Sequence, residues 1–384
     1  MLRYLRRYRQ MRIAVGVDLH SKTAVAHAVH AGGGEPGMRE AEFLDGFNRE
    51  FGGVPSTPEE MRRMAAALRG REACVLLENS TKTHETYWVL TNAGCKVTVA
   101  FAADLYRITK SVKKTDRNDA MELAAYMRRR MNGENEFSEC YMPSLDWMMK
   151  REICRTVFWE KRHLADLKRR VRSHLLLHGI TLSREYSDIF SRKATEEMRR
   201  TKDPCLLIAI SEAESIKKRT DDEARLVQHL FSKDRMYGMI CSIPGFGSIS
   251  AAYLTSLIVD ISRFRDSSSF SAYFGIVPKV RNSADSSPRC STTHRGDEDA
   301  RRLLCQSAMV HIRTVEDSVV TRMYHRLTGN GKAHKEALVA CARKLTTVVW
   351  SVVRSGLPFT DDAGLLARAD GAIEGVEEEM AEES

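Results

Sequence analysis

The chain has 384 residues, 43% of them hydrophobic, and this length suggests two or three domains with ordinary apolar cores. Its formal net charge is +9. Residues 361–384 hold nine acidic residues against Arg368 alone, a net charge of −8, which leaves +17 on residues 1–360. A body that basic indicates a polyanionic partner, most simply nucleic acid, and the acidic tail is expected to be disordered.

The composition also excludes several classes of protein. No apolar run approaches the roughly 20 residues that span a bilayer, so no membrane partner is expected, nor is a signal peptide. The nine cysteines are scattered, without a Cys-x-x-Cys pair. This pattern argues against a disulfide framework or a zinc site and predicts a cytoplasmic protein. Residues 1–10 are basic, which fits either a phosphate-binding arm or extra residues ahead of a start at Met11.

Residues 12–132 have the pattern of an α/β domain. Two β-rich runs, 13–18 and 23–29, are joined by a polar turn and predict a hairpin with Asp18 at the end of its first strand. After a Gly- and Pro-containing loop, a capping-box pattern at 56–60 predicts a helix. Residues 75–78 predict a strand that ends in Glu78, followed by a helix near Thr81 and another strand at 96–99. The alternation predicts a largely parallel inner sheet.

Residues 114–120, KTDRNDA, predict a helix start with two carboxylates, Asp116 and Asp119, on one face. Alone, the pair is typical of a helix N-terminus, where acids complement the dipole. Together with Asp18 and Glu78 at strand ends, however, it predicts four converging carboxylates, which repel unless cations neutralise them. Magnesium, bound by carboxylates and substrate phosphates, fits that demand and the chemistry of phosphodiester exchange. The neighbouring basic residues are expected to hold a nucleic-acid backbone: Lys110, Lys113, Lys114 and Arg117.

One alternative for the first motif is the phosphate loop of actin-like ATPases, which residues 15–18 with their hydroxyl-rich turn also resemble. That fold requires further Gly-rich phosphate loops, and none is convincing here.

The strings GVDLHSKT, LLENS and KTDRNDA resemble the DEDD nuclease domain of the insertion-sequence one-ten family of transposases. The resemblance implies a RuvC-like, RNase H-type fold and a magnesium site with four catalytic ligands: Asp18, Glu78, Asp116 and Asp119.

Residues 144–240 predict long helices. Six apolar residues between Ile153 and Leu175 step by three, four or seven positions, a heptad-like seam, and a second helical stretch covers about 205–240. This pattern predicts a helical hairpin with coiled-coil character that dimerises, or alternatively an intramolecular bundle. The basic residues that crowd the first helix, Arg155 and Arg162 among them, are either a solvated face or contacts to a nucleic-acid backbone.

Residues 241–356 predict a mostly α domain. The Pro-Gly-x-Gly sequence at 244–247 resembles a helix-hairpin-helix turn, whose backbone N–H groups can bind phosphate. The run from 262 to 304 resembles the C-terminal transposase domain of the same family, where a Gly-Pro strand exit precedes a serine-bearing loop. By that resemblance Ser283 is the DNA nucleophile. Here Asn282-Ser283-Ala284 replaces the usual Gln-Ser-Gly, so Ser286 and Ser287 stay open as alternatives. Four basic residues would bind the transferring phosphate: Lys279, Arg281, Arg295 and Arg301.

The resemblance implies a transposase that cleaves and exchanges DNA strands with Mg²⁺ through a serine–DNA intermediate. It further implies a homo-oligomer, a dimer or tetramer, programmed by an element-encoded bridge RNA that pairs with target and donor DNA. Two alternatives remain open at this stage. One is a structure-specific nuclease, of the type that resolves Holliday junctions, with only the four carboxylates and water. The other is an inactive scaffold that binds nucleic acid.

Overall fold

The computed structural model describes residues 11–105, 115–276 and 296–360. The chain divides into two compact units, residues 1–142 and 143–384, and each is described by itself. The expected N-terminal arm and acidic tail lie outside the described residues. In the described part, no helix combines the length and the apolar character needed to cross a bilayer.

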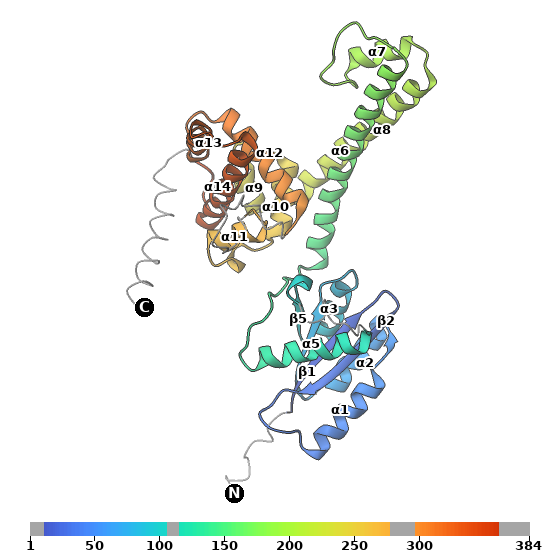
Figure 1. Cartoon of the computed structure of the whole chain (residues 1–384), viewed down its shortest axis with the longest axis vertical. Helices are drawn as coiled ribbons and strands as arrows, with labels where there is room; N and C mark the ends of the chain where they lie inside the picture. The colour runs from blue at the N-terminus through green and yellow to red at the C-terminus, as the bar shows by residue number, and fades with distance from the viewer. Residues whose placement is uncertain (1–10, 106–114, 277–295, 361–384) are drawn as a thin grey trace, which may run out of the picture. The chain divides into compact units, whose positions relative to one another are not determined.

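The first unit is built on a mixed sheet of five strands in the order β3-β2-β1-β4-β5 (Figure 1). Its elements are β1 (Arg12–Leu19), β2 (Thr23–His30), α1 (Met38–Glu50), β3 (Val54–Pro55), α2 (Pro58–Leu68), β4 (Glu72–Glu78), α3 (Thr83–Asn92), β5 (Lys96–Ala100), a 3-10 turn (Ala102–Asp104) and α5 (Asp116–Met131). The predicted hairpin of β1 and β2 is confirmed. Only β1, β4 and β5 are parallel to one another, so the expectation of a largely parallel sheet was too broad.

The two faces of the sheet bury different residues because side chains alternate along each strand. Val15 and Val17 of β1 join the apolar cluster formed with α1 and α2. Ala14, one residue out of phase, packs on the opposite face with α5. Gly16 lies on that second face, where a Cβ atom would come within 2.2 Å of the Ala120 carbonyl oxygen. A glycine at this position therefore lets α5 lie directly on the central strand.

Helix α1 replaces part of the loop expected between the hairpin and residue 56. Its buried residues Leu44 and Phe47 face the sheet, and the ring of Phe47 packs in a tilted arrangement on Phe51 with centroids 4.8 Å apart. The predicted helix start at 56–60 is confirmed, since Thr57 caps α2 by accepting from the Glu60 N–H. The aromatic pair packs α1 against the apolar cluster of the sheet, although the flanking glycines make its sequence pattern weak.

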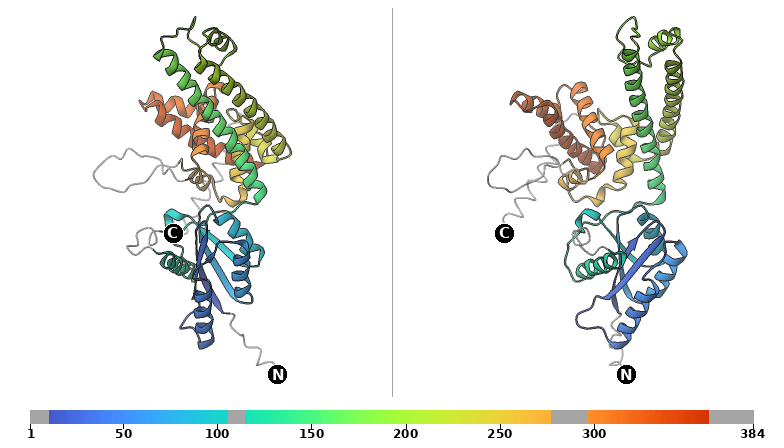
Figure 2. Two further views of the ribbon diagram at one scale, coloured as in Figure 1. Left: turned by 90° about the vertical axis from the view of Figure 1, so that its right-hand side faces the viewer. Right: turned by 45° about the vertical axis from the view of Figure 1, so that its right-hand side comes forward.

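The second unit is helical in its described part. Its elements are α6 (Leu145–Leu177), α7 (Arg192–Arg200), α8 (Pro204–Phe231), α9 (Arg235–Cys241), α10 (Ser248–Ile258), a 3-10 turn (Ile261–Arg263), α11 (Ser267–Tyr273), α12 (Glu298–Thr314), α13 (Val319–Gly329) and α14 (His334–Ser355). The predicted hairpin is present, because α6 and α8 run side by side (Figure 2). The expected second helix ends earlier than predicted, at Phe231, and Asp234 caps α9 after a short break.

The apolar seam of α6 is buried within the chain. Val157 packs with Val227 and Phe231 in the large C-terminal cluster, whereas Leu167 and Val171 belong to a separate cluster with α8 and the segment before α7. The segment that joins α6 to α8 therefore contributes to a core through Tyr186, Ile189 and Phe190. The seam of α6 therefore packs within the chain, as in the intramolecular bundle that the sequence analysis kept as an alternative. Dimerisation through this hairpin stays a prediction.

The C-terminal part of this unit surrounds α10, whose residues are buried almost throughout. The turn at 242–247 joins α9 to α10, as predicted. Its Gly245 has a φ of +100°, and a Cβ atom there would lie 2.3 Å from the Ser307 carbonyl oxygen of α12. The family resemblance implied a strand before the serine loop. Residues 267–273 instead form α11, and the described residues that follow it, up to Ile276, contain no strand. Aromatic packing of Phe270 on Phe264 and Phe274 favours the helix here.

Candidate functional site

Asp18 and Glu78 lie at the same edge of the sheet. Parallel pairing of β1 with β4 places Val17 opposite Leu77, so the carboxylate that follows each of these residues stands at the C-terminal end of its strand. Alternation puts both carboxylates on the face that α5 covers, since Leu76 packs there and Leu77 does not. Topology thus brings these two predicted site residues together.

Asp116 and Asp119 occupy the first turns of α5, next to this edge. Thr115 caps the helix by accepting from the Asn118 N–H at 3.3 Å, which fixes the helix start predicted from KTDRNDA. Asp119 is buried, whereas the side chain of Asp116 is 56% exposed. Because α5 packs closely on Gly16, the start of the helix is held beside Asp18.

His20 joins the two acidic positions and was not singled out in the sequence. Its Nε2 atom lies 3.3 Å from Oδ2 of Asp18 and 3.3 Å from Oδ1 of Asp116. The sequence contained a signal for this contact, because His20 follows the strand-end Asp18 by two residues and lies in the turn of the predicted hairpin. A lone histidine in a polar turn is too common a feature to assign from sequence.

The electrostatics of Asp18 reflect crowding of negative charge. Burial raises the pKa of this carboxyl group above 3.8, and repulsion from Asp119 and Asp116 adds to the rise, while His20 opposes it. Oδ2 of Asp18 is buried without a hydrogen bond in the described structure, apart from its ion-pair distance to His20. A bound cation would favour the ionised form that this environment disfavours.

The donor set fits a divalent cation. Oxygen atoms of Asp18 and Asp116 and a ring nitrogen of His20 lie within 4.8 Å of one another. Asp119 is close enough to raise the pKa of Asp18, and Glu78 lies on the adjacent strand end. Carboxylate oxygens are the protein ligands that Mg²⁺ prefers, and His20 adds a nitrogen donor that Mn²⁺ also accepts.

The predicted nucleic-acid contacts are only partly within the described residues. Arg117 is exposed at the start of α5, and burial together with Arg117 lowers the pKa of His27. Arg301 donates to the Gly296 carbonyl oxygen at 2.9 Å, at the end of the loop that precedes α12. The other predicted basic contacts and the candidate serines lie outside the described residues: Lys110, Lys113, Lys114, Lys279, Arg281, Arg295, Ser283, Ser286 and Ser287.

Two arginines of the basic run on α6 make ion pairs within the chain. Arg155 donates to Asp297 at 2.9 Å, and Arg162 donates to Asp299 at 2.6 Å. Both acids lie at the N-terminus of α12, so the two arginines connect α6 to α12 by ion pairs. Charges that are paired within the chain in this way are less available for a nucleic-acid backbone.

Residues 237–326 match the family model described as the transposase IS116/IS110/IS902 family. A transposase for insertion sequence element IS1328 from Yersinia enterocolitica is 31% identical over 140 residues, 36% of this chain and 41% of that protein. These matches make the chain similar to transposases of the IS116/IS110/IS902 family. This agrees with the family that the sequence motifs indicated.

Two further relatives are less similar in sequence. A pilin gene-inverting protein from Moraxella lacunata is 26% identical over 122 residues, 32% of this chain and 38% of its own length. A putative transposase, y4qE, from Sinorhizobium fredii is 22% identical over 375 residues, with 90% of each chain covered. The alignments with IS1328, IS116 and IS900 proteins each span 41% or less of those relatives.

Proposed function

We propose that this chain is a DNA transposase and recombinase that cleaves and exchanges strands at a Mg²⁺-dependent carboxylate site in its first unit. The observation that carries the proposal is the convergence of Asp18 with Asp116 and Asp119, from a strand end and a helix start about 100 residues apart in sequence. In a chain whose body is so basic, a partly buried acidic cluster is costly unless a cation and a phosphate complete it.

Each acid has a distinct position for this role. Asp18 is the buried central ligand, while the more exposed Asp116 is placed to meet substrate. Bound magnesium would stabilise both the attacking and the leaving oxygen of a phosphodiester exchange. Arg117, exposed next to Asp116, would hold the DNA backbone. We further propose that the five-stranded sheet with α5 is the RuvC-like, RNase H-type domain of this family.

The second half of the proposed reaction uses a serine. Ser283 would attack the DNA phosphorus, lose its hydroxyl proton and form a phosphoserine bond while a DNA hydroxyl leaves. Such a linkage retains the energy of the broken bond for rejoining. A gene-inverting relative favours strand exchange over simple hydrolysis, because inversion requires rejoining. A bridge RNA that pairs with target and donor DNA is proposed to select sites, as the family resemblance implies.

We also propose that the chain acts as a homo-oligomer. Several large apolar side chains on the α6–α8 hairpin remain exposed, including Trp159, Leu176 and Ile208. The seam of α6 is already covered within the chain, so an oligomer would use these outer residues. Coiled-coil pairing between chains would therefore involve a face different from the predicted seam.

The test uses the full-length protein and a plasmid that carries its gene with the flanking non-coding DNA. Asp116→Asn is expected to reduce strand cleavage by about 100-fold or more, because the loss of a metal ligand removes several kcal/mol of charge stabilisation. Asp146→Asn is a matched control, since Asp146 is also an exposed acid in the first turn of a helix. Equal activity of Asp116→Asn and wild type would favour the inactive scaffold instead.

A second variant separates recombinase from nuclease. Ser283→Ala is expected to abolish covalent protein–DNA adducts, measured by denaturing electrophoresis after partial digestion of the DNA. If cleavage continues in Ser283→Ala and the wild type forms no adduct, the protein is a nuclease that uses the carboxylates and water. If adducts persist in Ser283→Ala, a different serine, Ser286 or Ser287, is the nucleophile.

A further inference from the structure

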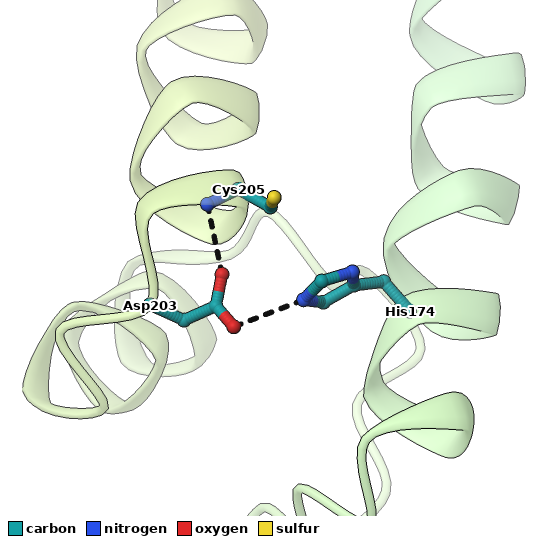
Figure 3. A group of neighbouring side chains, drawn as sticks. All are labelled: His174, Asp203 and Cys205. Atoms are coloured by element: carbon teal, nitrogen blue, oxygen red, sulfur yellow. Dashed lines mark hydrogen bonds and ion pairs between the residues drawn. The ribbon is translucent and has the colours of Figure 1, made fainter.

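The distal end of the α6–α8 hairpin brings together three side chains with metal-binding atoms. His174 comes from the last turn of α6, Asp203 is the N-cap residue of α8, and Cys205 lies in the first turn of α8. Figure 3 shows the three side chains converging from the two helices. Their donor atoms all lie within 4.8 Å of one another, and Nε2 of His174 is 3.0 Å from Oδ2 of Asp203.

We propose that His174, Asp203 and Cys205 form a binding site for a divalent metal ion of the zinc class. An imidazole nitrogen, a carboxylate oxygen and a thiolate sulfur are the three ligand types of tetrahedral zinc. Zinc–ligand distances of about 2.0–2.3 Å require donors roughly 3.3–3.8 Å apart. Because the donor atoms lie within 4.8 Å of one another, they need to approach by at most about 1.5 Å, which rotation of the exposed Cys205 side chain can supply.

Helix capping alone does not account for the cluster. The cap uses Oδ1 of Asp203, which accepts from the N–H groups of Cys205 at 2.8 Å and Leu206 at 3.0 Å. Oδ2 is left facing His174, and the thiol of Cys205 takes no part in the cap. Capping therefore holds the carboxylate in place with its second oxygen directed to the site, which is how supporting hydrogen bonds position metal ligands.

The surroundings favour a metal ion over a solvated ion pair. His174 and Asp203 side chains are each only 21% exposed. Apolar residues of both helices, Leu167 and Leu206 among them, line an adjoining cavity of about 320 Å³. The same residues belong to the buried cluster at this end of the hairpin. An ion here would link α6 to α8 beside this apolar cluster.

A fourth ligand is within reach. His178 follows His174 by four residues, and its ring centroid lies 4.3 Å from that of His174. The spacing His-x3-His is common in structural zinc sites, and rotation of the exposed His178 side chain would complete a tetrahedral set. The cysteine spacing in the sequence gave no sign of this site because only one of its ligands is a cysteine.

The test uses the full-length protein after removal of metals with a chelator. Titration with Co²⁺ is expected to give tetrahedral d–d absorption and a thiolate-to-cobalt charge-transfer band, both displaced by one equivalent of Zn²⁺. Cys205→Ser should abolish the charge-transfer band, whereas Cys95→Ser, at a half-buried cysteine of the first unit, should retain it. Asp18→Asn should also retain the band, which separates this site from the carboxylate site.

Two further measurements keep the proposal independent of any single variant. His174→Gln is expected to weaken zinc binding at least about tenfold, and His229→Gln, at an exposed histidine of α8, should leave it unchanged. In the wild type, Zn²⁺ should slow alkylation of Cys205 at least about tenfold, because a metal-bound thiolate is shielded. A charge-transfer band that survives in Cys205→Ser, or an alkylation rate that zinc does not change, would overturn the proposal.

Discussion

Replacing Gly16 by alanine tests whether the carboxylate site depends on the close packing of α5 on β1. A Cβ atom at this position would lie 2.2 Å from the Ala120 carbonyl oxygen, 2.3 Å from the Ala124 nitrogen and 2.6 Å from Cβ of Leu123. Backbone atoms cannot rotate away, so α5 must move outward by about 1 Å to restore van der Waals contact. Overpacking of this kind costs about 1–3 kcal/mol, and lowers Tm by roughly 4–12 °C for a unit of this size.

The same movement carries Asp116 and Asp119 away from Asp18. A displacement of about 1 Å can cost on the order of 100-fold in a positioned reaction, so cleavage should fall even at temperatures where the variant stays folded. Thermal unfolding and plasmid cleavage measure the two effects. Gly46→Ala is the control, since a Cβ atom there meets nothing within 4 Å and alanine favours its helix. Wild-type stability together with wild-type cleavage in Gly16→Ala would refute the argument.

Three other changes have defined outcomes. Burial and neighbouring acids raise the pKa of Asp18, so the ionised carboxylate lowers the free energy of unfolding. In the presence of a chelator, Asp18→Asn should therefore raise Tm at neutral pH. The gain should shrink as the pH falls towards 3.8, because the wild-type carboxyl group then becomes protonated. A margin that grows on acidification would contradict this. Gly245→Ala should cost about 1–3 kcal/mol in chemical denaturation, because its φ is +100° and Ser307 blocks the space, while Gly247→Ala should be near neutral. Arg219→Met should lower Tm, because the buried carboxylate of Glu160 would lose its charged partner. The double variant with Glu160→Gln should recover part of that loss in Tm. If Tm does not recover, the unpaired charge is not the cause of the loss.

Much of the first unit could be predicted because its motifs coincide with strand and helix ends. The turn after Asp18, the strand that ends in Glu78 and the cap at Thr115 each have local residue preferences that determine them. Convergence of these positions follows from parallel pairing and from side-chain alternation. Helix α1 was missed because Gly46 and the polar residues of the segment weaken the helical pattern, and packing of Phe47 against the sheet supplies the stability that the local sequence does not indicate.

Contacts between distant segments are harder to anticipate from sequence. His20 is an ordinary polar-turn residue until α5 places Asp116 beside it. Arg155 belongs to a basic run typical of nucleic-acid contacts, yet it pairs with Asp297, more than 100 residues later. Similarly, residues 267–273 form a helix that begins at a capping box of Asp266 and Ser269 and packs against Phe264 and α14. In each case a tertiary partner decides the outcome.

The α6–α8 hairpin carries two separate apolar clusters, with the ion pair of Glu160 and Arg219 between them. One cluster continues into the C-terminal helices, whereas the other is made by the hairpin and its connecting segment. Cooperative units of unfolding usually follow such boundaries. Amide hydrogens around Val171 and Ile210 should therefore exchange with deuterium through a partial opening, at a lower free energy than those near Val227, so the far end of the hairpin can fray and reclose while the rest stays folded.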